Sequence, residues 1–387
     1  MKKSYVITLK KNCCGCGACK QVCPQNCIKM EYDKEGFWYP NIDESRCVKC
    51  DLCKKVCPIL HCDANDDMYL DSYIAISNKT NRINSSSGGL FFLFAEQFIQ
   101  EGGVVFGASF DEKWQVRHVC IKSIDDIEKL MRSKYVQSNT KNTYKQTKEL
   151  LDIGKKVLYT GTPCQIAGLK SFLGKEYDEL VTVDIFCHGV PSPMIWLEYV
   201  HIMESKYMSS IKDINFRDKT HGWKNYSFSV SFADGQKEVE KKLDNEYMRM
   251  FLTDYILRPS CYDCKYKGLK RKCDITMGDA WGIEKIRPSY DDDKGVSLVI
   301  VHNKRGKKLL DTISRNCTLE KINVDDILPP KTGGRALAKI PEQRSLLFYH
   351  WIHGKNFCKM INSMYGGKKN YIMGKVTKIL FSNTKLK

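Results

Sequence analysis

Apolar and polar residues alternate along the middle of the chain in segments of strand and helix length. Five segments rich in apolar and β-branched residues predict strands, at residues 72–77, 104–108, 118–121, 155–159 and 181–186. Segments of helical pattern follow them at 90–100, 124–131 and 143–151. Residues 226–232, followed by Ala233-Asp234-Gly235, predict a hairpin. The alternation of strands and helices predicts an α/β (α+β) body.

Cysteines are concentrated at the N-terminal end of the chain. Residues 1–62 hold eleven of the 19 cysteines, and residues 63–119 hold none. The polar run from Asp63 to Asp67 has the composition of a linker, so we expect a separate domain at 1–62 and a linker at 63–71. Because the first residues lack the apolar core of a signal peptide, we expect a cytoplasmic protein with reduced cysteines that are available to metals.

One cysteine motif occurs twice in this N-terminal domain. The spacing C-x2-C-x2-C-x3-C-P is formed by Cys13, Cys16, Cys19 and Cys23, and again by Cys47, Cys50, Cys53 and Cys57. Soft thiolates at these spacings bind [4Fe–4S] cubanes, and the fourth cysteine of each run reaches the other cluster. We therefore predict a ferredoxin-like domain with two [4Fe–4S] clusters. One is held by Cys13, Cys16, Cys19 and Cys57, and the other by Cys47, Cys50, Cys53 and Cys23.

Zinc is the alternative metal for this domain, because C-x2-C pairs also build zinc ribbons. Zinc leaves the x3-C-P ending and its duplication unexplained. Cys14, Cys27 and Cys62 fall outside the repeat, and we interpret them as small packing residues.

The chain is basic, with a formal net charge of +17. Such a charge suits a nucleic-acid binder, a membrane-surface protein or a protein that docks an acidic electron carrier. Because Lys and Arg are spread along the whole chain, we expect a solvated basic surface and no nucleic-acid partner. The longest apolar run, 90–99, is too short to span a bilayer. The basic C-terminal extension, 331–387, has apolar residues at partly helical spacing after Lys368, and either packs on the body or contacts a membrane surface.

Four motifs follow one another along the body. They are Ser85 to Gly89, Ser133 to Ser138, Gly161 to Gln165 with Cys187 to Ser192, and Cys261-x2-Cys264 followed by Asp274 to Gly282. In these motifs and their order, the chain resembles the family of coenzyme F420 hydrogenase and dehydrogenase beta subunits. The resemblance covers about residues 72–330. It implies a flavin-binding region at 72–150 and a C-terminal region with cysteine-bearing loops at 151–330.

The resemblance also implies FAD, which exchanges a hydride with a substrate and single electrons with clusters. Ser87, Gly88 and Gly89 open a helix, where free N–H groups favour a phosphate; an ordinary turn and cap is the alternative. Lys134 is a candidate to neutralise that phosphate or contact the flavin edge, and Tyr135 to pack on the ring; a basic helix end with a core tyrosine is the alternative. Further cofactor-binding candidates in these motifs are Ser133, Gln137, Gly161, Thr162 and Gln165.

Four cysteines of the body are candidate ligands of a third [4Fe–4S] cluster. Cys164 and Cys187 each follow a predicted strand, and they converge if those strands are neighbours. Cys261 and Cys264 supply two more thiolates, and Cys273 is a fifth candidate. The alternative is that Cys164 and Cys187 are inert, and that the other three cysteines belong to a zinc knuckle.

The chain is therefore predicted to be an FAD- and iron–sulfur-dependent oxidoreductase that reacts with a deazaflavin coenzyme (F420) or another conjugated substrate. His188 and Asp279 are candidates for proton handling, with a cap or hydrogen-bond anchor as the alternative for each. The expected partners are a redox protein or ferredoxin and a small-molecule hydride donor or acceptor. Two rival functions are a non-catalytic electron-transfer subunit and a redox-sensing protein of nucleic acid or membrane surfaces.

Overall fold

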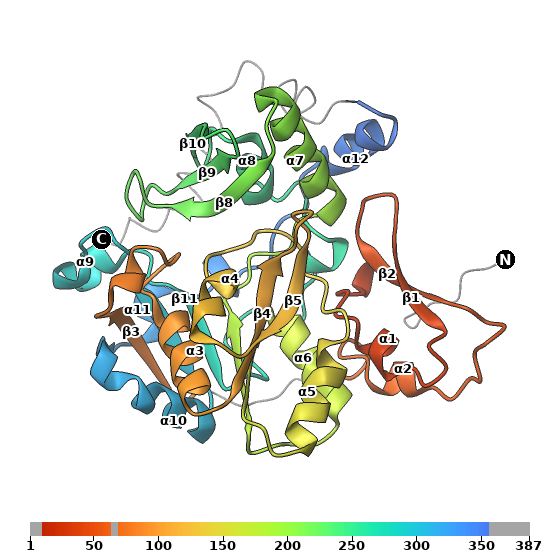
Figure 1. The fold of residues 1–387 in the computed structure, drawn as a ribbon, viewed down its shortest axis with the longest axis horizontal. Helices are drawn as coiled ribbons and strands as arrows, with labels where there is room; N and C mark the ends of the chain where they lie inside the picture. The colour runs from red at the N-terminus through yellow and green to blue at the C-terminus, as the bar shows by residue number, and fades with distance from the viewer. Residues whose placement is uncertain (1–9, 63–68, 356–387) are drawn as a thin grey trace.

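A computed structural model describes residues 10–62 and 69–355 of the chain (Figure 1). The N-terminal domain consists of α1 (Ala18–Val22), α2 (Leu52–Lys55) and an antiparallel pair of strands, β1 (Ile28–Tyr32) and β2 (Trp38–Ile42). The polar run from Asp63 to Asp67 and the apolar pattern after Lys368 lie outside the described residues.

An eight-stranded mixed sheet forms the centre of the body. Its order is β13-β3-β12-β11-β7-β6-β4-β5. The strands are β3 (Asp71–Ser77), β4 (Val104–Phe110), β5 (Val116–Ile121), β6 (Val157–Gly161), β7 (Leu180–Ile185), β11 (Ile275–Asp279), β12 (Ser297–Val301) and β13 (Cys317–Lys321). Four consecutive strands, β11, β7, β6 and β4, are parallel to one another. Parallel strands end at the same edge, so the loops that follow them meet there.

Helices cover both faces of this sheet. One face packs against α3 (Leu90–Gln100), α4 (Ile127–Leu130) and α10 (Lys304–Thr312). The other packs against α5 (Thr143–Asp152) and α6 (Pro163–Leu173), and nearer β3 against α9 (Ile283–Ile286) and α11 (Val324–Ile327). Successive residues of a strand point to opposite faces, and accordingly Val105 lies in the first core and Phe106 in the second.

A second, smaller sheet lies above one end of the large sheet in Figure 1. It contains β8 (Ile211–Asp218), β9 (Ser227–Phe232) and β10 (Lys237–Lys241) in the order β10-β9-β8. Its core is shared with α7 (Pro193–Tyr207), α8 (Glu246–Leu252) and α12 (Arg344–Ile352). The predicted hairpin is the β9-β10 part of this sheet. The α/β fold class with an N-terminal ferredoxin-type domain is confirmed.

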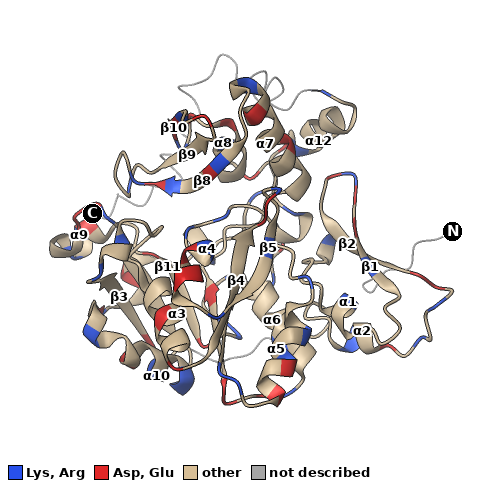
Figure 2. Ribbon diagram, in the orientation of Figure 1, with Lys and Arg blue, Asp and Glu red and all other residues tan. Residues whose placement is uncertain are grey.

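The N-terminal domain packs directly on the body. Cys16 and Ala18 share a hydrophobic core with Ile166 and Leu169 of α6. Lysines, arginines and acidic residues are interspersed over both parts (Figure 2). Within residues 10–62 and 69–355, every helix is too short or too polar to cross a membrane.

Candidate functional site

The cysteines predicted for the first cluster lie together in the N-terminal domain. Burial raises the pKa of the Cys19 thiol, and the thiols of Cys13 and Cys57 raise it further. Cys16 interacts electrostatically with Cys13 and Cys19. Gly17, with a φ angle of 78°, begins α1 between Cys16 and Cys19 and lets the chain turn sharply there. The structure therefore brings this predicted set into one place.

The cysteines predicted for the second cluster also lie near one another in the N-terminal domain. Burial raises the pKa of the Cys53 thiol, and the neighbouring Cys47 and Cys50 thiols raise it further. The Sγ atom of Cys23 lies 3.3 Å from that of Cys27, and Cys27 interacts in turn with Cys47. Cys27, interpreted from the sequence as a packing residue, thus lies among the predicted ligands.

Within the described residues, no group of three or more His, Cys, Asp or Glu side chains is arranged to hold a single metal ion.

The four cysteines predicted for a third cluster also converge. Because β6 and β7 are parallel neighbours, Cys164 at the start of α6 and Cys187 after β7 meet at one edge of the sheet. Burial raises the pKa of the Cys187 thiol to about 12, and the Cys164 and Cys264 thiols contribute to this shift. Burial also raises the pKa of Cys261, and the thiols of Cys187, Cys164 and Cys264 raise it further.

Two more cysteines border this group. Cys14 of the N-terminal domain interacts with the thiol of Cys164. Cys273, the fifth candidate, is buried and hydrogen-bonds to Thr276 Oγ1 over 3.4 Å. Cys14 therefore connects the two domains at this group of cysteines, whereas the Cys273 thiol is hydrogen-bonded to a residue of β11.

A buried arginine lies beside the body cysteines. The side chain of Arg271 is 1% exposed, and within the described part of the chain its Nε and Nη2 atoms have no hydrogen-bond partner. Its charge acts on the thiols of Cys187 and Cys264. Unsatisfied buried donors are costly, so an anionic acceptor at this place fits the site. Arg271 belongs to no motif, so no pattern in the sequence points to it.

The predicted cofactor residues near Cys164 make contacts within the protein. Thr162 caps α6, and its backbone N–H donates to Gln165 Oε1 over 3.0 Å in a capping box. Gln165 Nε2 donates to the Ser138 carbonyl over 3.1 Å. Gly161 lies under this cap, because a Cβ there would stand 3.2 Å from Gln165 Oε1. These residues shape the loop that carries Cys164.

The serine–glycine loop, residues 85–89, is closely packed where α3 begins. Gly88 N–H donates to Ser297 Oγ over 3.0 Å, and a Cβ on Gly88 would stand 2.4 Å from the Ala75 carbonyl oxygen. Gly89 precedes the helix with a φ angle of 89°. Both glycines are buried and Ser87 is half-buried, so the serines are the more exposed side of this loop.

Two partly buried lysines lie near Arg217, and one of them contacts this loop. Lys219 Nζ donates to the carbonyl oxygens of Arg82 and Ser87, over 2.9 and 3.2 Å. Burial and the charge of Arg217 lower its pKa to about 8. The same two causes lower the pKa of Lys242 to about 8. Burial and a neighbouring charge make the charged form of both lysines less stable. A bound anion would offset this cost, so the two lysines favour an anionic ligand.

Ser133 and Lys134, two predicted cofactor-binding residues of the 133–138 motif, lie near the 85–89 loop. Ser133 donates from its N–H and its hydroxyl to Ser86 Oγ, over 2.8 and 3.0 Å. Lys134 Nζ donates to the Met131 carbonyl over 2.6 Å. Burial, together with the charge of Arg132, lowers the pKa of Lys134 to about 7.

We refer to Lys134, Lys219, Lys242 and Arg217 together as the cationic site. Arg217 joins this site to Asp279. Its guanidinium forms two hydrogen bonds to the Asp279 carboxylate, over 3.0 and 3.1 Å, and one to Tyr135 Oη over 3.2 Å. Trp223 Nε1 also donates to Asp279, over 2.8 Å. The Nε atom of Arg217 is buried and has no partner within the described residues. Asp279 thus holds Arg217, and one donor of Arg217 remains for a ligand.

An aromatic series joins the cationic site to the body cysteines. The Tyr135 ring stacks on Phe251 with centroids 4.6 Å apart, and Phe251 meets His188 edge-on at 5.2 Å. His188 directly follows Cys187, and its Nε2 atom lies 2.6 Å from Asp254 Oδ1. The two groups of candidate site residues are therefore connected through packed side chains.

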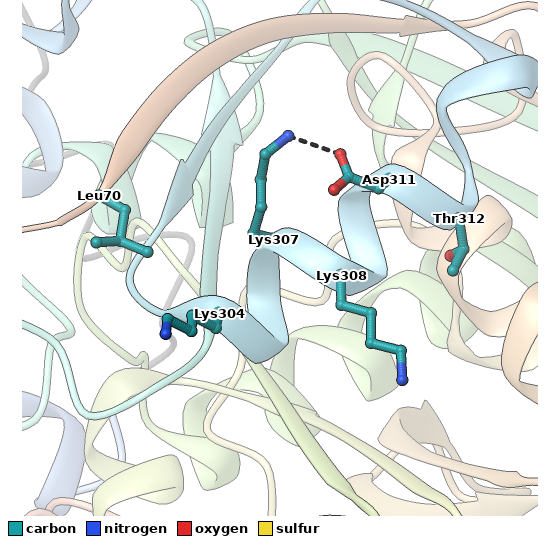
Figure 3. A pocket seen from close by; sticks show the side chains of 6 residues that line it. All are labelled: Leu70, Lys304, Lys307, Lys308, Asp311 and Thr312. Carbon is teal, nitrogen blue, oxygen red and sulfur yellow. Dashed lines mark hydrogen bonds and ion pairs between the residues drawn. The ribbon is translucent and has the colours of Figure 1, made fainter.

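A separate surface groove of about 540 Å³ lies beside α10 (Figure 3). Its lining consists of Leu70, Lys304, Lys307, Lys308, Asp311 and Thr312. Lys307 Nζ is already paired with Asp311 Oδ1 at 2.6 Å. None of the predicted site residues lines this groove, and we assign it no role.

Comparisons with known proteins identify two regions. Residues 154–327 match the family model for the C terminus of the coenzyme F420 hydrogenase/dehydrogenase beta subunit, and residues 12–59 match the 4Fe-4S dicluster domain. No curated protein matches the chain. Thirteen chains of solved structures match. One, from a xenon-derivatised F420-reducing [NiFe] hydrogenase complex of Methanosarcina barkeri, is 18% identical with a TM-score of 0.45, covering 80% of this chain and 95% of that chain.

The two family matches coincide with the two groups of cysteines. The dicluster match contains both copies of the cysteine motif, and the beta-subunit match contains Cys164, Cys187, Cys261 and Cys264. The chain is therefore an iron–sulfur protein with a 4Fe–4S dicluster domain at residues 12–59, and its residues 154–327 correspond to the C-terminal region of the coenzyme F420 hydrogenase/dehydrogenase beta-subunit family.

Proposed function

We propose that this chain is an FAD-dependent oxidoreductase that passes electrons between three [4Fe–4S] clusters and FAD, and a hydride between FAD and a deazaflavin coenzyme (F420) or another conjugated substrate. The observation that carries the proposal is the convergence of four body cysteines between the dicluster domain and the cationic site. Cys14 contacts this group from one side, and His188 leads from it toward Tyr135 on the other.

The body cysteines suit a third cluster because their surroundings supply positive charge. Four thiolates in one buried place repel one another unless cations offset them. The orphaned donors of Arg271 lie beside Cys187 and Cys264, where they can donate N–H···S bonds to a cluster. Such hydrogen bonds stabilise iron–sulfur clusters and tune their reduction potentials.

The cationic site suits FAD because it combines positive charge with an aromatic wall. Lys219 and Lys242 are the proposed phosphate-binding cations, and Lys219 contacts the Ser87 carbonyl of the 85–89 loop. Tyr135 is the proposed contact of the flavin ring. When bound, FAD supplies a carrier that takes two electrons as hydride and releases them singly.

The chain's own residues handle the accompanying proton. His188 Nε2 is held by Asp254, which orients the imidazole and fixes which nitrogen carries the shared proton. Asp279 accepts three hydrogen bonds from Arg217 and Trp223, so we assign it to the positioning of Arg217. His188 is thus our candidate for proton transfer near the hydride.

Anaerobic purification of the full chain tests the proposal. We expect one FAD and about twelve irons per chain, with matching sulfide, because three cubanes contain four irons each. Reduced F420 should bleach the flavin, and electrons should then reach added ferredoxin. Full iron and sulfide without flavin would indicate a non-catalytic electron-transfer subunit, and zinc without sulfide would contradict the clusters themselves.

A further inference from the structure

Arg258 is a completely buried arginine at the boundary between the dicluster domain and the body. Its residue exposure is 0%. Nε donates to the Cys13 carbonyl over 2.7 Å, and Nη2 to the Trp38 carbonyl over 2.9 Å, both in the dicluster domain. Nη1 donates to Gln137 Oε1 of the body over 3.0 Å. One guanidinium therefore holds the two domains together.

Every hydrogen-bond acceptor of this guanidinium among the described residues is neutral. Two are backbone carbonyls and one is an amide oxygen, and the ring of Tyr39 lies 4.2 Å from the guanidinium carbon. Buried charges are normally paired, because an uncompensated ion in the protein interior costs several kcal/mol. Arg258 therefore requires a negative charge that the ordinary side chains around it do not supply.

Arg344 at the same boundary shows the ordinary solution. It is also buried, and its guanidinium forms a bidentate pair with the Glu35 carboxylate, over 3.0 and 2.6 Å. Glu35 belongs to the dicluster domain and Arg344 to α12 of the body. The two arginines thus bridge the same domains, but only Arg344 has a carboxylate partner among the described residues.

The groups that face Arg258 are cysteines of two proposed clusters. Its charge interacts with the thiols of Cys13 and Cys14 in the dicluster domain and with Cys261 in the body. It also acts on Cys164. The Cys261 N–H donates to the Arg258 carbonyl over 2.8 Å, so a single turn of the backbone holds these two residues together. A cubane with four thiolates is an anion and becomes more negative by one charge on reduction.

We infer that Arg258 is the shared counter-charge of the cluster that contains Cys13 and the cluster that contains Cys261, and that it raises the reduction potential of both. The inference rests on the proposed function, because both clusters are its premise. A fixed positive charge between two anions stabilises the reduced form of each, since each accepts one electron. It also keeps the two clusters adjacent while electrons pass between them.

The test compares three variants of the full anaerobic chain. Arg258→Met removes the charge, Arg258→Lys keeps it, and Arg344→Met is the matched control that breaks the other arginine bridge. Iron and sulfide are measured first, and the reduction potentials of the clusters are then followed by electron paramagnetic resonance. Absence of clusters in the parent would refute the proposed function, which distinguishes that failure from failure of the Arg258 inference.

We expect Arg258→Met to lower the potentials of two clusters, and Arg258→Lys and Arg344→Met to leave them near the parent values. A shift in one cluster only, or an equal shift in Arg344→Met, would overturn the shared role. If Arg258→Met loses its clusters, retention of clusters at parental potentials in Arg258→Lys supports the role of charge. Loss of clusters in both Arg258 variants would overturn it in favour of the hydrogen-bond geometry of the guanidinium.

Discussion

The thiol of Cys14 interacts with the thiol of Cys164, although the two residues belong to different domains. Cys14 lies in sequence between Cys13 and Cys16, two proposed ligands of a dicluster-domain cubane. Cys164 is a proposed ligand of the body cluster. This pair therefore places the two proposed cluster sites next to each other across the domain boundary.

The cationic site predicts that FAD binds more weakly as the pH rises. The pKa of Lys134 is lowered to about 7, and those of Lys219 and Lys242 to about 8. Bound phosphate raises these values, so the free protein loses protons in a range where the complex keeps them. The affinity is therefore greatest below pH 7, and we expect it to fall by about tenfold or more between pH 7 and pH 9.

Fluorescence titration of the flavin-free chain with FAD from pH 6 to pH 9 measures this effect. Lys219→Arg and Lys242→Arg keep their charge throughout this range, so the double variant should show a flatter profile. An affinity of the parent protein that does not change with pH would exclude these lysines as phosphate ligands.

Gly88→Ala should destabilise the body without touching a cysteine. The added Cβ would stand 2.4 Å from the Ala75 carbonyl oxygen and 2.7 Å from the Ser297 nitrogen, both backbone atoms of neighbouring strands. Overpacking of this kind costs about 1–3 kcal/mol. Gly102→Ala is the control, because its Cβ meets nothing within 4 Å and only its φ angle of 76° opposes the change. Urea midpoints should fall further for Gly88→Ala; equal midpoints would contradict the close packing.

Cys50→Ala should remove one cluster from the dicluster domain. Cys50 is one of three cysteines in a single loop, and a cubane with three thiolates loses iron or falls apart. We expect about four fewer irons per chain than in the parent protein. Cys62→Ala is the matched control, because Cys62 follows the repeat and should leave the iron content unchanged. Identical iron in Cys50→Ala and the parent would show that Cys50 is not a ligand.

Local pattern predicted the elements of this fold better than their arrangement. The helix expected at 90–100 is α3, Leu90–Gln100, because its apolar run has a glycine cap before it and Gly102-Gly103 after it. The order of the large sheet depends on pairing between distant segments, such as β3 with β12 and β13. Such pairings are decided by packing over more than 200 residues, and periodicity carries no information about them.

In the candidate site too, some residues were predicted from the sequence and others became apparent only in the fold. Spacing identified the ligands proposed in the dicluster domain, whereas the four body cysteines were selected from the family resemblance and from the ends of two predicted strands. Cys14 and Cys27 were set aside since they fall outside the repeat, yet both contact predicted ligands. Arg258 and Arg271 gave no signal, because most arginines are exposed and only the fold shows that these two are buried.

Cys187→Ala and Cys261→Ala test the third cluster. Each removes one of four converging thiols, so iron should fall by up to about four per chain while the dicluster domain keeps its own clusters. Cys273→Ala is the matched control, because Cys273 is a buried cysteine that is hydrogen-bonded to Thr276. Iron measured beside the parent protein decides the outcome. Unchanged iron in both Cys187→Ala and Cys261→Ala would leave these cysteines as packing residues or zinc ligands.

The same variants should separate hydride transfer from electron transfer. The proposed flavin site consists of the 85–89 loop, Lys219, Arg217 and Tyr135, none of which is altered, so reduced F420 should still bleach FAD in Cys187→Ala. Electrons should then fail to reach added ferredoxin, because the intermediate relay between FAD and the dicluster domain has gone. Stopped-flow absorbance resolves the two steps in one experiment. Rapid ferredoxin reduction by Cys187→Ala, at the rate of Cys273→Ala, would place the electron route outside these four cysteines.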